Sequence, residues 1–369
     1  MIYLDSAATS FQKPPQVLRA VEKTLREAAS PGRGAYGAAM KAAETMLEAR
    51  ESAAAFFRFR DPERVVMTMN ATHALNLAIR SFASKGGRVV ISGYEHNAVT
   101  RPLRGYGFEI DVAGEKLFDS EDLIRSFRNK LVGASLAVCT HVSNVFGYIL
   151  PIREIAALCR DHGVPLIIDA SQSAGVLALD ADALDADFIA MPGHKSLLGI
   201  PGSGLLLCSA PASPLLYGGS GSDSISQDMP SYLPERLEAG TQNAPAAAAI
   251  SAGIRYIQAR GRDRIESHEK ELCLHMSEIL GKRDGIELFL PPQGEHSGVL
   301  SLRAEGTDCE TIASALSRED ICVRSGLHCA PLAHESAGTL RTGTVRFSFS
   351  PFNTHGEIEK AAVKLIKII

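Results

Sequence analysis

The sequence has no strong excess of either charge and no long apolar run. Its 38 lysines and arginines against 42 aspartates and glutamates give a formal net charge of −4, which argues against a nucleic acid or an anionic membrane as partner. No apolar run is long enough to cross a bilayer. Residues 1–15 lack the basic start and apolar middle of a secretory signal.

Paired cysteines and nucleotide-binding loops are also missing. The seven cysteines include no CxxC pair, which argues against a disulfide framework or zinc site and for free thiols in a reducing cytosol. The glycine clusters at 199–204 and 218–224 match neither GxxxxGK[ST] nor GxGxxG after a first strand, so a nucleotide loop is not favoured. With 369 residues, 45% hydrophobic and 22% charged, the chain is long enough for two packed lobes.

Short apolar runs alternate with helical patterns between residues 64 and 208. The segment 151–163 has helical spacing, begins with Pro151 and ends at Gly163, and lies between two apolar runs, which is the pattern of a βαβ unit. Runs rich in Val, Ile and Leu that are linked in this way predict a mostly parallel sheet with helices on both faces. The runs are 64–69, 88–92, 135–142, 164–169, 187–191 and 203–209.

The pattern changes after about residue 250. A smaller α+β lobe is predicted, with helices at 263–281, 308–319 and 354–369 and strands at 286–290, 298–304, 321–325 and 344–350. We predict a large domain over 15–245 and a small domain made of 1–14 and 246–369. The Gly/Ser-rich segment 216–234 between them is too long for a tight turn and is either a mobile or a functional loop.

Several polar residues directly follow apolar strands, where ligands collect in an open parallel sheet. Asn70 to Thr72 open a helix, whose free amides and dipole favour a phosphate, although a plain helix cap explains them as well. His96 follows the strand at 88–92, and a structural histidine is the alternative there. Asp169 ends the strand at 164–169, where a carboxylate must pair with a cation or cap a helix. Lys195 follows the strand at 187–191.

A lysine, an acid and a phosphate cradle on one rim are the set that pyridoxal 5′-phosphate (PLP) requires. The lysine bonds the cofactor, the acid keeps the pyridine nitrogen protonated, and the helix start holds the phosphate. Such a lysine must be partly deprotonated, which burial and a nearby cation favour. The sequence therefore predicts a PLP site built around Lys195 and Asp169.

Eight motifs occur in order between residue 3 and about residue 354. They read YLDSAAT, NATHALNLAI, EHNAVTRPL, HVSNVFG, IIDASQSAG, PGHKSLLG, EAGTQNAP and RSGLHCAPLAH…VRFSFSPFNT. Together they resemble the motifs of the cysteine desulfurases of the class-V aminotransferase fold. The resemblance implies an α/β protein of the aspartate-aminotransferase-like (type I) PLP fold, with a mostly parallel large-domain sheet and a smaller α+β domain. It also implies a cytoplasmic homodimer acting on L-cysteine or L-selenocysteine in sulfur metabolism, such as iron–sulfur cluster assembly.

The resemblance also assigns cofactor roles. Lys195 would bear PLP, Asp169 would pair with its ring nitrogen, and Gln172 would bond its ring oxygen. His96 would stack on the ring and shuttle a proton. The phosphate would be held by Ala71, Thr72, His194 and, from the second subunit, Thr241.

Cys329 falls at the position of the family's sulfur nucleophile, on a loop flanked by glycine and proline. The resemblance implies that its thiolate receives sulfur as a persulfide, with Arg324 and His328 as the nearby cations. The short segment from Cys329 to Arg346 resembles the branch that needs an accessory acceptor protein. The substrate pocket would be formed by Arg346 and Asn144, which grip the carboxylate, and by Ala7, Ala8 and Arg324.

Three residues depart from the family pattern. Pro192 replaces a hydroxyl residue near the phosphate, Leu327 replaces a histidine beside the nucleophile, and His73 stands where an acid is common.

Besides a cysteine desulfurase, we weigh a selenocysteine lyase, a class-V aminotransferase that would not need Cys329, and a non-catalytic scaffold that retains the fold. The physiological sulfur acceptor is not specified by these motifs.

Overall fold

The structure, a computed structural model, describes residues 1–32, 34–114 and 116–369. Its largest element is a seven-stranded sheet in which β8 alone runs against the other strands, as the antiparallel pairing of β8 with both its neighbours shows. The mostly parallel sheet predicted from the sequence is confirmed. From edge to edge the strands are β2 (Val65–Thr68), β8 (Gly204–Cys208), β7 (Phe188–Pro192), β6 (Leu166–Asp169), β5 (Leu136–Thr140), β3 (Arg88–Ser92) and β4 (Glu109–Ala113).

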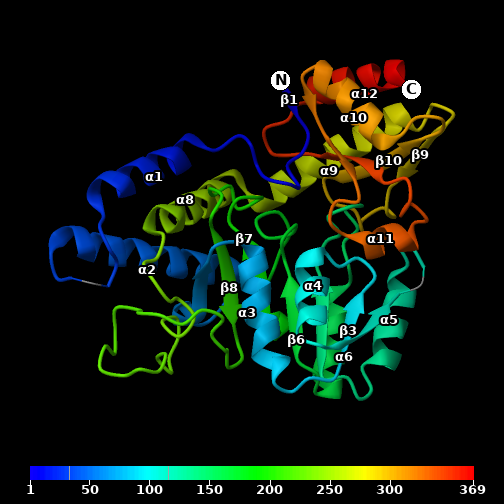
Figure 1. The fold of residues 1–369 in the computed structure, drawn as a ribbon. Coiled ribbons are helices and arrows are strands. Elements are labelled where there is room, and N and C mark those ends of the chain that lie inside the picture. The colour runs from blue at the N-terminus through cyan, green and yellow to red at the C-terminus, as the bar shows by residue number, and fades with distance from the viewer. Residues whose placement is uncertain (33, 115) are drawn as a thin grey trace.

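Helices cover both faces of this sheet (Figure 1). Successive strand residues alternate between the two cores, so that Val90 packs on one face and Ile91 on the other. One face is covered by α3 (Ala71–Ala83) and α4 (Asn97–Gly105). The other is covered by α2 (Gly37–Phe57), α5 (Ser120–Lys130), α6 (Ile152–His162), α7 (Ala181–Leu184) and α8 (Ala244–Arg260).

A smaller antiparallel sheet lies at the top of Figure 1 with its own core. Its strands, in order, are β12 (Arg324–Gly326), β13 (Thr344–Ser348), β10 (Val299–Ala304) and β9 (Ile286–Phe289). That core also contains residues of α9 (Arg262–Leu280), α10 (Cys309–Arg318) and α12 (His355–Ile368), and the short helix α11 (Pro331–Ser336) follows β12 in the chain. The domain bounds set from the sequence stay a prediction.

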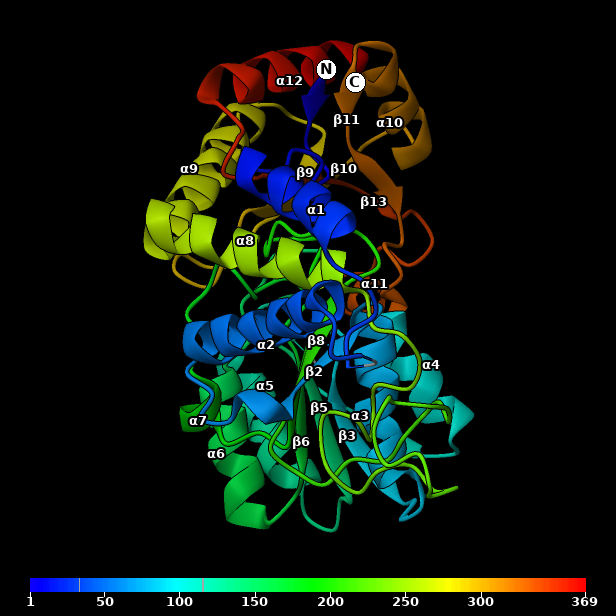
Figure 2. The ribbon, with the colours of Figure 1, turned by 90° about the vertical axis from the view of Figure 1, so that its left-hand side faces the viewer.

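The N-terminal segment reaches both parts of the molecule. The short strand β1 (Ile2–Tyr3) pairs in parallel with β11 (Ile321–Cys322), and Leu4 lies in the core of the smaller sheet. The chain then runs to α1 (Pro15–Glu27), which packs on α8 as α2 does (Figure 2). Residues 4–14 therefore connect the small sheet with the helices beside the large one.

One predicted strand is wrong. Residues 321–325 were expected to form a single strand, but the structure has β11 and β12 there, on either side of Val323. The two pieces pair with different partners, β11 with β1 and β12 with β13, so the chain must turn between them.

The 3-10 turn Pro62–Arg64 precedes β2. No helix in the described ranges is long and apolar enough to cross a membrane.

Candidate active site

A pocket of about 510 Å³ lies at the carboxyl ends of the parallel strands, where open α/β sheets place their ligands. Each of five strands supplies residues at or just after its end, because parallel strands finish at one edge of the sheet. Most of the predicted cofactor residues meet here. The lining is Asn70, Ala71, Thr72, His96, Ala98, Thr140, Val142, Asn144, Asp169, Ser171, Gln172, Pro192, His194 and Lys195.

Lys195 lies in the turn after β7, and its surroundings make the amine easier to deprotonate. Burial, together with the charges of Arg346 and Arg324, lowers the pKa of Lys195 to about 8, with the charge of Asp169 opposing the shift. The turn is packed against α8: a side chain at Gly253 would place its Cβ 2.0 Å from the carbonyl oxygen of Leu197. Only glycine at that point of α8 lets the helix approach the lysine turn this closely.

The turn is also held by the N-terminal segment through the carbonyl oxygen of His194. That oxygen accepts hydrogen bonds from Ser10 N (3.0 Å), Ser10 Oγ (2.9 Å), Thr9 Oγ1 (3.2 Å) and Lys13 Nζ (3.3 Å). The ring nitrogen Nδ1 of His194 lies 3.0 Å from Thr9 Oγ1. Burial, with the charges of Lys195 and Lys13, lowers the pKa of His194 to about 4, so the ring is neutral at pH 7.

Asp169 ends β6 and is buried, as the sequence predicts for a functional carboxylate. Its Oδ1 accepts from Ser171 N at 2.9 Å, and its backbone oxygen accepts from His141 N at 2.9 Å. These bonds fix the carboxylate at the pocket wall. Gln172 also lines the pocket, but its Nε2 donates to the carbonyl of Ala7 at 3.0 Å.

The start of α3 forms another wall of the pocket. Asn70 caps the helix by accepting from His73 N at 2.8 Å, which leaves the amides of Ala71 and Thr72 in the first turn without intrahelical partners. The two alternatives for this segment, a plain helix cap and a phosphate site, are therefore both compatible with the structure. Asn70 caps the helix, and the amides that it leaves free face a pocket that also contains Lys195.

His96 caps α4 with its ring. Its Nδ1 accepts from Ala98 N at 2.9 Å, so the proton of the neutral ring belongs on Nε2. Burial, followed by the charges of Lys195, Arg324 and Arg101, lowers the pKa of His96 to about 4, with Asp169 opposing. In this arrangement the neutral His96 ring can donate a hydrogen bond from Nε2, whereas protonation at Nδ1 would break the helix cap.

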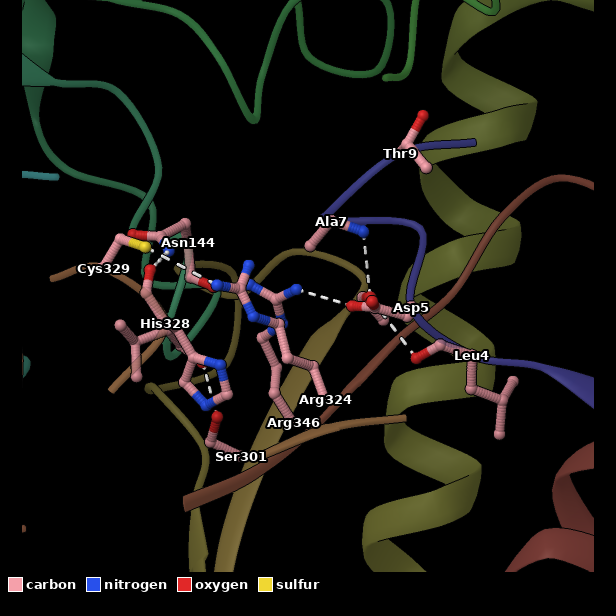
Figure 3. A network of polar contacts seen from close by, with 12 residues as sticks. Leu4, Asp5, Ala7, Thr9, Asn144, Ser301, Arg324, His328, Cys329 and Arg346 are labelled. Atoms are coloured by element: carbon pink, nitrogen blue, oxygen red, sulfur yellow. Dashed lines mark hydrogen bonds and ion pairs between the residues drawn. The ribbon is translucent and has the colours of Figure 1, made fainter. Parts of the chain in front are cut away.

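A network of polar contacts adjoins the pocket on the side of the small sheet (Figure 3). The fully buried Arg346 donates from Nη1 to the carbonyl of Asn144 at 2.8 Å and from Nη2 to Asp5 Oδ1 at 2.7 Å. Asn144 donates from Nδ2 to the carbonyl of His328 at 2.7 Å. The two residues expected to grip a carboxylate are thus in contact, and each already has a protein partner.

Cys329 lies on a backbone that a side chain rarely adopts. His328 and Cys329 have φ values of 49° and 59°, in the left-handed region that costs non-glycine residues about 1 kcal/mol each. The loop is held by Asn144 Nδ2 on the carbonyl of His328 and by Asn97 N on the carbonyl of Cys329, the latter at 2.7 Å. On this loop Cys329 is exposed, whereas Cys322 is half-buried and the other five cysteines are buried.

The cation beside Cys329 is Arg324, and the expectation for His328 is wrong. Arg324 Nη2 lies 3.5 Å from the sulfur of Cys329. The His328 ring is buried, with Nε2 3.1 Å from Thr344 Oγ1. Burial and the charge of Arg346 lower the pKa of His328 to about 2, so it carries no charge at pH 7. Adjacency in sequence does not place its ring beside the thiol.

Six expected residues lie outside the pocket lining, namely Cys329, Arg324 and Arg346, described above, and Ala7, Ala8 and Thr241. Ala7 is buried and donates from N to Ser348 Oγ at 2.9 Å, and Ala8 follows it in the same turn. Thr241 lines a different hollow, together with Met69, His73 and Glu238. The loop that carries Thr241 is anchored by Glu238, which receives two hydrogen bonds of 2.7 Å from the buried Arg50.

Sequence reasoning missed two acidic residues at this site. Asp5 lies within the quoted motif YLDSAAT, yet its contact with Arg346 joins segments 341 residues apart, which spacing cannot indicate. Glu95 precedes His96 and is fully buried: its Oε1 accepts from Ser92 Oγ (2.6 Å) and Thr140 N (2.8 Å), which ties the ends of β3 and β5 together. Burial raises the pKa of Glu95 to about 8.

This fold and this pocket belong to a known class of proteins. The chain belongs to the class-V aminotransferase family, whose profile matches residues 2–361. A probable cysteine desulfurase of Methanothermobacter thermautotrophicus is 34% identical over 371 residues, covering 97% of this chain and 92% of that protein. The resemblance stated from the motifs is confirmed.

Solved structures agree. The apo structure of a cysteine desulfurase from Thermococcus onnurineus NA1 has a TM-score of 0.91 and 32% identity, over all of this chain and 94% of that one. The cysteine desulfurase CsdA of Escherichia coli has a TM-score of 0.88 and 25% identity, over 99% and 94% of the chains. The predicted fold class is therefore confirmed, and the family to which it belongs uses PLP.

Proposed function

We propose that this protein is a PLP-dependent cysteine desulfurase that converts L-cysteine to L-alanine and passes the sulfur to Cys329 as a persulfide. One observation carries the proposal beyond the family: the exposed Cys329 is hydrogen-bonded through its loop to residues that belong to the Lys195 pocket or adjoin it. An aminotransferase on the same fold has no use for a strained, exposed thiol at this place.

The residues present fit PLP. A lysine with a pKa lowered to about 8 and a buried carboxylate share one pocket with the open first turn of a helix. Lys195 would hold the cofactor's aldehyde carbon, Asp169 its ring nitrogen, and the α3 amides with Thr72 and His194 its phosphate. Gln172 would hold the ring oxygen. Pro192 lines the same pocket without a hydroxyl to offer, so α3 and His194 would carry more of the phosphate binding.

When bound, PLP withdraws electrons from the α-carbon of an amino acid and so loosens the bond between its β-carbon and sulfur. Arg346 would bind the substrate carboxylate, with Asn144 beside it. His96 would lie against the cofactor ring and hold a proton at Nε2. Ala7 and Ala8 would bound the substrate side chain.

The thiolate of Cys329 then attacks the substrate sulfur. A sulfur–sulfur bond forms, the carbon–sulfur bond breaks, and its electron pair stays on the carbon, which takes up a proton and becomes the methyl group of alanine. Arg324 would lie beside the attacking sulfur, because its Nη2 is 3.5 Å from the sulfur of Cys329. A thiol reductant or an acceptor protein removes the sulfur from the persulfide.

The proposal includes a homodimer. Thr241 lies outside the Lys195 pocket of its own chain, and the family resemblance assigns it to the phosphate of a second subunit. Exposed apolar side chains lie beside this loop, because Met69 and Leu216 line the same hollow as Thr241 and Leu47 of α2 lines another with Gln242. Gel filtration with light scattering tests the dimer, and a monomer that retains full activity would contradict it.

The central experiment measures alanine and sulfide from L-cysteine, with and without a reductant, in purified wild type and two variants. Wild type is expected to be yellow and active. Lys195→Ala is expected to lose both colour and activity, whereas Cys329→Ala keeps the colour and loses cysteine turnover by at least about 100-fold. Cysteine turnover by Cys329→Ala would contradict its role, and the same assay with L-selenocysteine tests selenocysteine lyase activity.

A further inference from the structure

Arg346 is already paired with a carboxylate of the protein itself. Its Nη2 donates to Asp5 Oδ1 at 2.7 Å, and the side chains of the pair are 1% and 19% exposed. Asp5 sits between β1 and the turn of Ala7, where an isolated bridge pairs it with Ser348, two residues beyond Arg346. The aspartate is therefore held beside the guanidinium by backbone pairing, and is not a side chain that reaches it by chance.

The charges around Arg346 are arranged for one further anion. Arg324 and Arg346 lie directly opposite each other in the β12–β13 pairing, where like charges destabilise a sheet. The ionisable groups that interact with Arg346 include Asp5, Arg324, Tyr3, Lys195 and His328, and among these five only Asp5 is a carboxylic acid. These groups carry more positive than negative charge around Arg346, so a second carboxylate would balance the cluster.

Arg346 also has unused hydrogen-bonding capacity. Its Nε is buried and has no hydrogen-bond partner in the described ranges, and a buried donor left unpaired costs about 1–3 kcal/mol. The guanidinium can therefore gain a bond when an amino acid enters. It would donate that bond to a substrate carboxylate against the repulsion of Asp5, because Asp5 already accepts from the neighbouring nitrogen Nη2.

We propose that Asp5 is a positioning residue that sets the affinity of the site for amino acids: a built-in carboxylate that positions Arg346 in the free site and competes with the carboxylate of the incoming amino acid for it. The inference rests on the proposed function, because it takes Arg346 as the substrate's carboxylate site. Asp5 sets how tightly amino acids are held, and the two carboxylates repel each other across one guanidinium. Its effect falls on binding and leaves the chemical step at Cys329 unchanged.

The test is Asp5→Asn, which keeps an oxygen for Arg346 Nη2 and removes the negative charge. We expect the KM for L-cysteine and the dissociation constant of the product L-alanine to fall at least about threefold, with kcat changed by less than about twofold. Asp263→Asn is the matched control, because Asp263 pairs with Arg262 on the exposed face of α9, and its KM should equal that of wild type.

An unchanged or higher KM in Asp5→Asn, with wild type active, would overturn the inference. A wild type that releases no alanine from L-cysteine would contradict the proposed function instead. Thermal melts check that the variant folds, and Asp5→Ser, which removes the charge with a smaller side chain, takes its place if it does not. If neither variant folds, Asp5 is a structural residue and the inference is wrong.

Discussion

Nη2 of Arg324 lies 3.5 Å from the sulfur of Cys329, and the two residues lie at opposite ends of one short segment that begins with β12. The arginine is on the edge strand of the small sheet, and the cysteine is on the strained loop that follows. Since the loop is fixed by Asn97 and Asn144, the contact is a property of the fold.

The first prediction concerns this contact. Arg324→Gln should slow the reaction of Cys329 with iodoacetamide at pH 7 by about 3- to 10-fold, because it removes the cation 3.5 Å from the nucleophilic sulfur. Mass spectrometry of the labelled peptide measures the rate. Arg318→Gln on α10, an arginine whose Nη1 donates to Ser314 Oγ at 3.2 Å, is the control. Equal rates in both variants would contradict a role for Arg324.

The second prediction concerns the buried pair that anchors the loop of Thr241. Glu238 receives hydrogen bonds from both terminal nitrogens of Arg50 and from Met67 N. Glu238→Ala leaves the guanidinium buried without its carboxylate and should lower the free energy of unfolding by about 3 kcal/mol. Urea unfolding measures the loss. Glu319→Ala, which breaks the exposed pair with Lys364, should leave the midpoint unchanged.

The third prediction concerns pH and a buried acid outside the site. Burial raises the pKa of Glu269 on α9 to about 8, and the charge of Glu266 adds to the rise. The folded protein therefore retains a proton that the unfolded chain loses near pH 4.5, so this residue makes stability fall as the pH rises from about 4.5 to 8.

Glu269→Gln should remove that fall. Variant and wild type should be about equally stable at pH 5, and the variant should be more stable at pH 8, by on the order of 3 kcal/mol. Urea midpoints at the two values measure the difference. Glu271→Gln changes an exposed neighbour on the same helix, and its stability should change with pH as that of wild type does. The same pH dependence in Glu269→Gln would contradict the prediction, because it would mean that Glu269 is ionised in the folded protein.

Much of the large sheet could be predicted, because its strands and helices follow from sequence patterns within each segment. The helix over 152–162 follows from spacing, Pro151 and a left-handed Gly163 at its end. Residues that follow strand ends, such as Asp169 and Lys195, meet because parallel strands finish at one edge. This prediction does not require knowing which strands are neighbours, because all parallel strands of one sheet end at the same edge.

The rest of the site depends on long-range contacts that spacing does not encode. Asp5 meets Arg346 only because β1 and β13 are brought together from the two ends of the chain. The neutrality of His328 follows from its burial near Thr344 and not from its place beside Cys329. The break at Val323 likewise reflects two pairing partners, one of them at the N-terminus.

The four donors on the carbonyl of His194 have a practical consequence for handling this protein. Because Thr9, Ser10 and Lys13 supply them, trimming the first thirteen residues for crystallisation would loosen the lysine turn from a distance. Such a truncated preparation should lose its yellow colour on dialysis, although no residue of the pocket lining itself has been removed.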